Sequence, residues 1–234
     1  AFQGCKMLRE VTLNDGLKYI GISCFEGCTS LKSIKLPKSL KVLRENAFRV
    51  CTALQTVEFA EGMDFYTDEG GYFSYGFYNN VFDGCESLHT VILPKSASKG
   101  FIIPPSTFSW CSNLKSIEFP VNTTNIGHMA FFYTGIENLD FTHITSDKIY
   151  LEGYYTFGGC KSLKTVTANS NLTFDSSSLY TFQWCESLET VKISGSGDDY
   201  TKITPDAFRY CDNLTSVEVY RLKGTGERNE MDSV

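Results

Sequence analysis

The chain has 234 residues, of which 42% are hydrophobic, and a formal net charge of −6 at pH 7. Nucleic-acid-binding proteins gather Lys and Arg on one surface, so a pI near 5.2 argues against DNA or RNA as a partner. No stretch approaches the roughly 18 consecutive apolar residues of a membrane-spanning helix, so we expect no membrane insertion.

One motif, Phe-x-x-Cys-x-x-Leu-x-x-(Val/Ile)-x-apolar, recurs along the whole chain. Its sixth copy is one residue shorter and has Thr134 in the cysteine position. Successive Phe residues are 23 to 34 positions apart. Most of these spacings lie in the length range of leucine-rich repeats. The nine copies occupy residues 2–13, 25–36, 48–59, 82–93, 108–119, 131–141, 157–168, 182–193 and 208–219.

Each copy predicts two short elements. The (Val/Ile)-x-apolar piece has the two-residue period of a strand, and the Phe-x-x-Cys-x-x-Leu piece has the spacing of a tight helical turn. One copy cannot bury its apolar face alone, so the copies must stack. The sequence therefore predicts an α/β solenoid, a right-handed leucine-rich repeat horseshoe of about nine repeats with a parallel β-sheet on its concave face.

The repeated strings resemble those of the BspA-like leucine-rich repeat (LRR) family of bacterial surface proteins. CFEGCTSLKSIKLP at 24–37 and TFSWCSNLKSIEFP at 107–120 carry the resemblance, which covers residues 1–220. It implies a secreted or surface-anchored protein that binds extracellular-matrix or other surface proteins. It implies no catalytic residues, because the family has none in common.

The domain prediction is one solenoid over residues 1–222, followed by a polar tail at 223–234 that we expect to be disordered. The chain starts in the middle of a repeat, whereas solenoids carry polar caps. We therefore expect an upstream cap and an export signal outside this sequence.

Cysteines occupy one column of the repeat, apart from Cys24. Stacked copies place neighbouring thiols about 4.8 Å apart with parallel side chains. A disulfide needs Cβ atoms about 3.8 Å apart, and Thr134 in the same column argues against a ligand role. We predict buried free thiols rather than disulfides or a zinc site.

An insertion at 62–80 lengthens one copy and is rich in aromatic residues. Tyr-rich loops offer rigid contact area for a partner, and insertions in repeat proteins often lie on the binding face. The alternative is that its rings only cover the side of the solenoid. The candidate binding residues are Phe65, Tyr66, Tyr72, Phe73, Tyr75 and Tyr78, while Phe77 belongs to an apolar column of the repeat.

A second aromatic column follows the repeated Phe by two positions. Its members, Trp110, Tyr133, Trp184 and Tyr210, are further candidate binding residues. Stacking across neighbouring copies, Trp110 on Tyr133 and Trp184 on Tyr210, is the structural alternative.

Catalytic chemistry has little support in the sequence. His89, His128 and His143 lie in different copies without metal-ligand spacing, and no hydrolase, zinc-protease or phosphate-binding motif occurs. We therefore expect no enzyme activity, no cofactor and no metal.

The sequence predicts an extracellular binding module for a protein partner, with two alternatives left open. A glycan-binding protein would use carboxylates and amides beside the insertion's rings, such as Asp64, Asp68, Asn79 and Asn80. A structural spacer would only project another domain, and its insertion rings would be packed.

Overall fold

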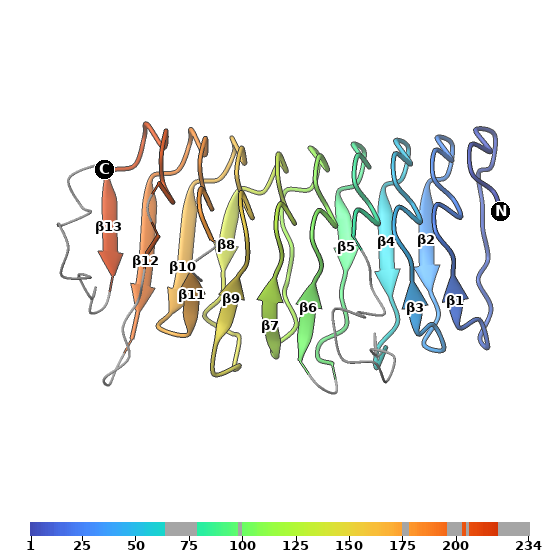
Figure 1. The fold of residues 1–234 in the computed structure, drawn as a ribbon, viewed down its shortest axis with the longest axis horizontal. Helices are drawn as coiled ribbons and strands as arrows, with labels where there is room; N and C mark the ends of the chain where they lie inside the picture. Colours follow the sequence, from blue (N-terminus) through green and yellow to red (C-terminus); the bar gives the residue numbers. More distant parts are fainter. Residues whose placement is uncertain (64–78, 98–99, 175–177, 196–202, 205, 220–234) are drawn as a thin grey trace.

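Parallel strands in two rows build the chain into an elongated solenoid (Figure 1). The computed structural model describes residues 1–63, 79–97, 100–174, 178–195, 203–204 and 206–219. Positions 64–78 of the predicted insertion and the whole predicted tail lie outside these residues. One turn of the solenoid is called a rung below, and rungs are numbered by their copies of the motif.

The first strand row arises from the (Val/Ile)-x-apolar pieces. Its strands pair in parallel in the orders β2-β4-β5 and β8-β10-β12-β13. Alternate residues point into the solenoid, as in β2, where Ile34 and Leu36 are buried. The row consists of β2 (Ser33–Leu36), β4 (Thr56–Phe59), β5 (Thr90–Ile92), β8 (Asn138–Asp140), β10 (Thr165–Asn169), β12 (Thr190–Ser194) and β13 (Ser216–Val219).

The second strand row lies on the other side of each rung. Its strands pair in the orders β1-β3 and β6-β7-β9-β11. The sequence showed this row only as a large apolar residue five positions before most of the Phe residues, such as Ile20 and Leu43. A strand of two to four residues has too little alternation to recognise. The row consists of β1 (Tyr19–Ile20), β3 (Val42–Leu43), β6 (Phe101–Ile103), β7 (Thr123–Ile126), β9 (Ile149–Leu151) and β11 (Leu172–Phe174).

A parallel β-solenoid is confirmed, but the α/β repeat and the count of nine are not. Within the described parts of the chain no residue is helical, so none forms a helix long and apolar enough to cross a bilayer. The copies at 2–13 and 108–119 contribute no strand to the first row, which therefore marks seven rungs.

Left-handed residues make the Phe segment a turn instead of a helix. The position two after the Phe has positive φ in every copy, whether it holds Gly27 (70°) or Trp110 (60°). A right-handed helix does not accommodate such residues. The peptide groups bond to the next rung instead, as the Phe25 N–H does to the Ala47 carbonyl at 2.8 Å. Hydrogen bonding between rungs thus replaces the hydrogen bonding within a helix that the spacing predicted.

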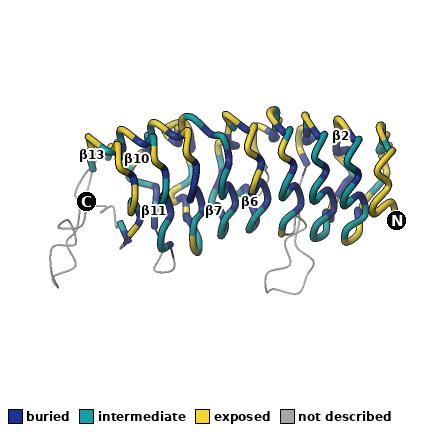
Figure 2. The backbone as a smooth tube through the Cα atoms, turned by 90° about the horizontal axis from the view of Figure 1, so that it is seen from above, coloured by how far each residue is buried: buried dark blue, intermediate teal, exposed yellow. Residues whose placement is uncertain are grey.

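The repeated phenylalanines form one stack of nearly parallel rings through the core. Centroids of neighbouring rings are 5.1 to 5.7 Å apart from Phe2 to Phe208. Figure 2 shows buried residues recurring along the length of the solenoid, whereas the first rung is largely exposed.

Free thiols line the core beside this stack, as predicted. Seven cysteines of the repeat column are buried and unpaired. Each donates from Sγ to the carbonyl of the Phe one rung earlier at 3.1 to 3.2 Å, as Cys51 does to Phe25. Burial raises the pKa of Cys51 and of Cys211 to about 12, so both thiols remain protonated near neutral pH.

Cross-rung ion pairs lie on the outer face of the first strand row. Lys35 faces Glu58 with 2.5 Å between Nζ and Oε1, and Lys192 faces Glu218 at 3.0 Å. Each pair joins directly paired positions of neighbouring strands. They are exposed, so each contributes roughly 0–1 kcal/mol to stability.

Candidate interaction surface

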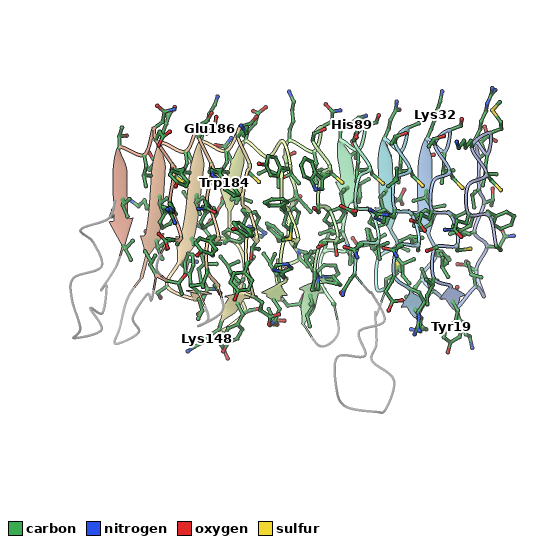
Figure 3. The ribbon with its side chains drawn as sticks, turned by 45° about the horizontal axis from the view of Figure 1, so that its top comes forward. Tyr19, Lys32, His89, Lys148, Trp184 and Glu186 are labelled. Atoms are coloured by element: carbon green, nitrogen blue, oxygen red, sulfur yellow. The ribbon has the colours of Figure 1, made fainter. Side chains whose placement is uncertain are left out.

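Aromatic side chains gather on one flank of rungs five to eight, beside the tight turns that carry the repeated Phe. Figure 3 shows Trp184 between two edges of the solenoid, one marked by His89 and Glu186 and the other by Tyr19 and Lys148. We name the cluster the aromatic belt. It consists of Trp110, Phe132, Tyr133, Tyr154, Tyr155, Tyr180 and Trp184.

Two face-to-face pairs form the centre of the belt. The Trp110 and Tyr133 rings are 4.5 Å apart with 2° between their planes. The Tyr155 and Trp184 rings are 5.6 Å apart with 3° between their planes. Phe132 joins the pairs, with its ring centroid 4.5 Å from Tyr133 and 5.6 Å from Tyr155. The rings therefore form one connected network across the rungs.

The network continues toward the second strand row. Tyr180 stacks on Tyr155 at 5.2 Å and on Tyr154 at 6.3 Å. Tyr154 meets His128 edge to face at 5.9 Å, and its backbone N–H donates to His128 Nδ1 at 3.0 Å. Burial lowers the pKa of His128, so the imidazole is neutral at pH 7 and accepts this hydrogen bond.

Several belt residues have a left-handed backbone, which is unfavourable for a bulky side chain. Their φ angles are 60° at Trp110, 55° at Tyr133, 56° at Tyr155 and 62° at Trp184. The cost is roughly 1–2 kcal/mol per non-Gly residue. Four copies have Gly two positions after the Phe, among them Gly159. The turn itself therefore does not require an aromatic residue there.

Two adjacent glycines lie beneath the belt rings. A Cβ on Gly159, which has φ +69°, would lie 2.9 Å from the Tyr133 ring. A Cβ on Gly158 would lie 2.9 Å from Tyr155 Cβ and 3.3 Å from the Phe132 ring. Because these two residues of rung seven have no side chain, the rings of Phe132, Tyr133 and Tyr155 can lie close to the backbone there.

The belt is partly open to solvent. Trp110 is 49% exposed and Tyr154 is 44% exposed, while the other members are partly buried. Among the described residues, the indole N–H groups and tyrosine hydroxyls of the belt have no hydrogen-bond partner. Nearby, Lys161 Nζ pairs with Glu186 Oε1 at 2.7 Å, and this contact raises the pKa of Lys161.

Three of the four residues in the predicted aromatic column join the belt. Stacking of Trp110 on Tyr133 is confirmed. The predicted stacking of Trp184 on Tyr210 is wrong, because Trp184 stacks on Tyr155 from the preceding rung. Tyr210 lies outside the belt, 49% exposed, with the guanidinium carbon of Arg209 4.9 Å from its ring centroid. The six candidates of the insertion lie outside the described residues.

Three central belt residues, Phe132, Tyr155 and Tyr180, were not among the candidate residues of the sequence analysis. Tyr155 and Tyr180 precede the Phe by two positions, and both have positive φ. Other copies hold Ser23, Asn46 or Asp206 at this position, residue types that tolerate the left-handed region. The available signal was an aromatic residue in a column that holds Ser, Asn or Asp in most other copies and Met129 in one.

The described residues contain no group of three His, Cys, Asp or Glu side chains that could hold a metal ion. His89 bonds to Thr90, His128 to Tyr154, and His143 to the Phe119 carbonyl. What this flank offers is therefore stacking, apolar contact and hydrogen-bond donation.

Comparison with protein families matches residues 1–70 and 145–227 to the BspA type leucine-rich repeat region, in six copies. Comparison with curated protein sequences finds no match. A solved leucine-rich repeat protein from Bacteroides ovatus is 25% identical over 94% of this chain, with a TM-score of 0.49. The chain spans 63% of the length of that protein. The T. pallidum leucine-rich repeat protein is 17% identical over 80% of this chain and 68% of its own, with a TM-score of 0.47.

Proposed function

Because the chain belongs to the BspA-type leucine-rich repeat family, we propose that it is a non-catalytic extracellular adhesion module. In this proposal it recognises a protein partner, either a host matrix protein or a protein of a cell surface. The resemblance of its repeats to proteins of bacterial surfaces supports the location. The scaffold supports a binding role, since stacked repeats offer an extended surface for partners.

The observation that carries the proposal is the aromatic belt. Trp and Tyr are enriched among the residues that dominate protein–protein binding energy. The belt keeps bulky residues such as Trp110 in a strained backbone where other rungs have glycine. Strain of this kind concentrates at functional sites. We include Tyr210 and the insertion residues Phe65, Tyr66, Tyr72, Phe73, Tyr75 and Tyr78 in the proposed site.

We also infer that nine rungs stack in a leucine-rich repeat horseshoe. The unbroken stack of nine repeated Phe rings supports this number, since it includes the two copies that lack a strand in the first row. The parallel first row is the expected lining of the concave face. The tight turns take the place of helices on the flank.

Binding of the chain to arrays of matrix proteins and polysaccharides tests the proposal. The test variant is Trp110→Gly/Trp184→Gly, which introduces the residue that other rungs already have at this position. A second variant replaces 62–76 with a short Gly-Ser turn, and Tyr19→Ser, a 63% exposed tyrosine on β1, is the matched control. Native secondary structure is checked for all of them.

We expect binding to at least one protein that the Trp double variant weakens and Tyr19→Ser does not. Loss of binding in the 62–76 variant alone would restrict the site to the insertion and exclude the belt. Equal binding by every variant would contradict a site on this flank. The absence of binding to any protein would favour a spacer, and belt-dependent binding to polysaccharides alone would favour a glycan-binding protein.

A further inference from the structure

We propose that the solenoid has a hinge at rung five, where the first strand row is interrupted. The strands on either side form two separate ladders, β2-β4-β5 and β8-β10-β12-β13. Between the ladders, residues 115–119 form no strand, and Figure 1 shows only coil between β5 and β8 in this row. We call this interruption the first-row break. Bending at the break does not depend on the proposed binding function.

Backbone hydrogen bonds are missing at the first-row break. In an intact part of the row, the N–H groups of Thr56 and Ala60 donate to carbonyls of rung two. Within the described parts of the chain, no N–H group of residues 115–119 donates to a backbone carbonyl, so no such bond joins rung five to rung four here. Toward rung six a single backbone bond remains, from the Glu137 N–H to the Lys115 carbonyl at 3.0 Å.

The buried Val/Ile column of the first row opens at the same place. Val91 and Ile117, on the two sides of the break, are only partly buried. Beside them, Ile92 is 48% exposed. A side chain loses contacts where a neighbouring strand does not cover it, so the break resembles an end of the sheet inside the solenoid. The column members at most 2% exposed are Ile34, Val57, Leu139, Val166 and Val191.

Changes of one residue in the repeat accompany the break. Copy six is one residue shorter, and its turn lies so close to rung five that a Cβ on Gly135 would be 2.3 Å from the Ser112 carbonyl oxygen. In the second row the register shifts by one residue at Phe101, where β7 has an additional residue opposite β6. Such irregularities bend a strand and disrupt its ladder locally.

The rest of rung five keeps the two halves of the solenoid together. On the flank, the N–H groups of Phe82 and Phe108 donate to carbonyls of the following rung at 3.0 and 2.9 Å. The Phe stack also passes through Phe108 without interruption, with centroid distances of 5.7 and 5.5 Å. Opening follows the side with the fewest bonds and buried contacts. We therefore place the axis of bending at the flank, so that motion changes the separation of β5 and β8.

Amide hydrogen exchange of the native chain, resolved by residue with NMR, tests the break without any substitution. Glu118 and Glu58 form a matched pair, since they occupy the same repeat position in SIEF at 116–119 and TVEF at 56–59. Glu58 lies within the β2–β4 ladder, whereas Glu118 lies in the break. We expect the Glu118 N–H to exchange roughly a hundredfold faster. Equal exchange of the two groups would overturn the hinge.

Distances between two spin labels, measured by electron paramagnetic resonance, test the bending itself. The test pair is Lys32→Cys/Lys164→Cys at the edge of the first row, and the control pair is Lys18→Cys/Lys148→Cys at the edge of the second row. Figure 3 shows Lys32 and Lys148 on these two opposite edges. All four lysines are exposed, and each pair spans five rungs, or about 24 Å, across rung five.

A Cys5→Ser/Cys24→Ser background confines labelling to the introduced cysteines, because the other seven are buried. We expect a distance distribution about twice as broad for the first-row pair as for the second-row pair, because only the first row opens. Equal widths, or a broader second-row pair, would overturn the hinge. If the labelled variants do not fold, the exchange of Glu118 and Glu58 decides.

Discussion

At the scale of the residue, one backbone position determines whether a rung presents an aromatic side chain on this flank. The position two after the repeated Phe is left-handed in every copy, and it holds Gly in four copies and Trp or Tyr in four others. Glycine enters this region without steric cost, whereas a side chain with a Cβ does not. The aromatic residues thus combine an unfavourable backbone with favourable stacking.

Replacement of Trp110 tests this balance. Trp110→Gly loses stacking worth about 0.5–1.5 kcal/mol but removes the left-handed strain. Trp110→Ala loses the stacking and keeps the strain. We therefore expect the Gly variant to be more stable than the Ala variant by about 1 kcal/mol, the reverse of the usual order. Urea unfolding of both variants measures the difference, and a less stable Gly variant would contradict the left-handed backbone.

Gly159 makes the complementary prediction. Gly159→Ala adds a Cβ at φ +69° and 2.9 Å from the Tyr133 ring, so we expect a loss of about 1–3 kcal/mol of stability. Gly21→Ala is the matched control, because a Cβ there meets no atom within 4 Å. Thermal unfolding compares them. If both variants unfold at the same temperature, Tyr133 does not lie against Gly159.

At the scale of the element, the repeat spacing predicted the core but not the local hydrogen bonding. The columns of Phe, Cys and Leu correctly predicted stacked copies with buried thiols, whereas the stack of Phe rings was not predicted. The spacing of three residues also fits a helix, and only the Gly residues in the column distinguish the left-handed turn. The second row escaped prediction because strands such as β1 and β3 have two residues each.

The thiol column makes a pH prediction. Burial raises the pKa of Cys51 from 9.0 to about 12 in the folded chain, so the unfolded chain releases this proton first as the pH rises. The protonated thiol therefore makes its full contribution to the free energy of unfolding below about pH 8.5–9. This contribution decreases by about 1.4 kcal/mol per pH unit between that pH and about pH 12. We expect the urea concentration at the midpoint of unfolding to be lower at pH 10.5 than at pH 8.

Cys51→Ala is the control for this prediction, because its midpoint should fall less steeply over the same range. Ellman's reagent provides a second check, with fast reaction at exposed Cys5 and reaction at the seven buried cysteines only on unfolding. Fast reaction of the whole column in the native chain would contradict its burial.

At the scale of the whole molecule, one flank carries two kinds of surface. In rungs one to four it carries a polar network in which Arg49 bonds Asp83 at 2.9 Å and Glu26 at 3.3 Å, and Gln3 bonds Glu26 at 2.9 Å. In rungs five to eight the same flank carries the aromatic belt. The sequence predicted part of this division through Trp110, Tyr133 and Trp184. The connection through Phe132, Tyr155 and Tyr180 depends on contacts between rungs that no single repeat shows.

Tryptophan fluorescence tests the belt as a binding surface most directly, since both tryptophans of the chain are belt residues. The measurement is acrylamide quenching of the native chain, alone and saturated with the matrix protein that it binds on the array. A tryptophan-free fragment of that protein keeps the signal specific to the belt. We predict a shifted emission maximum and at least a twofold smaller quenching constant in the complex. Unchanged emission and quenching at saturation would contradict binding through the belt.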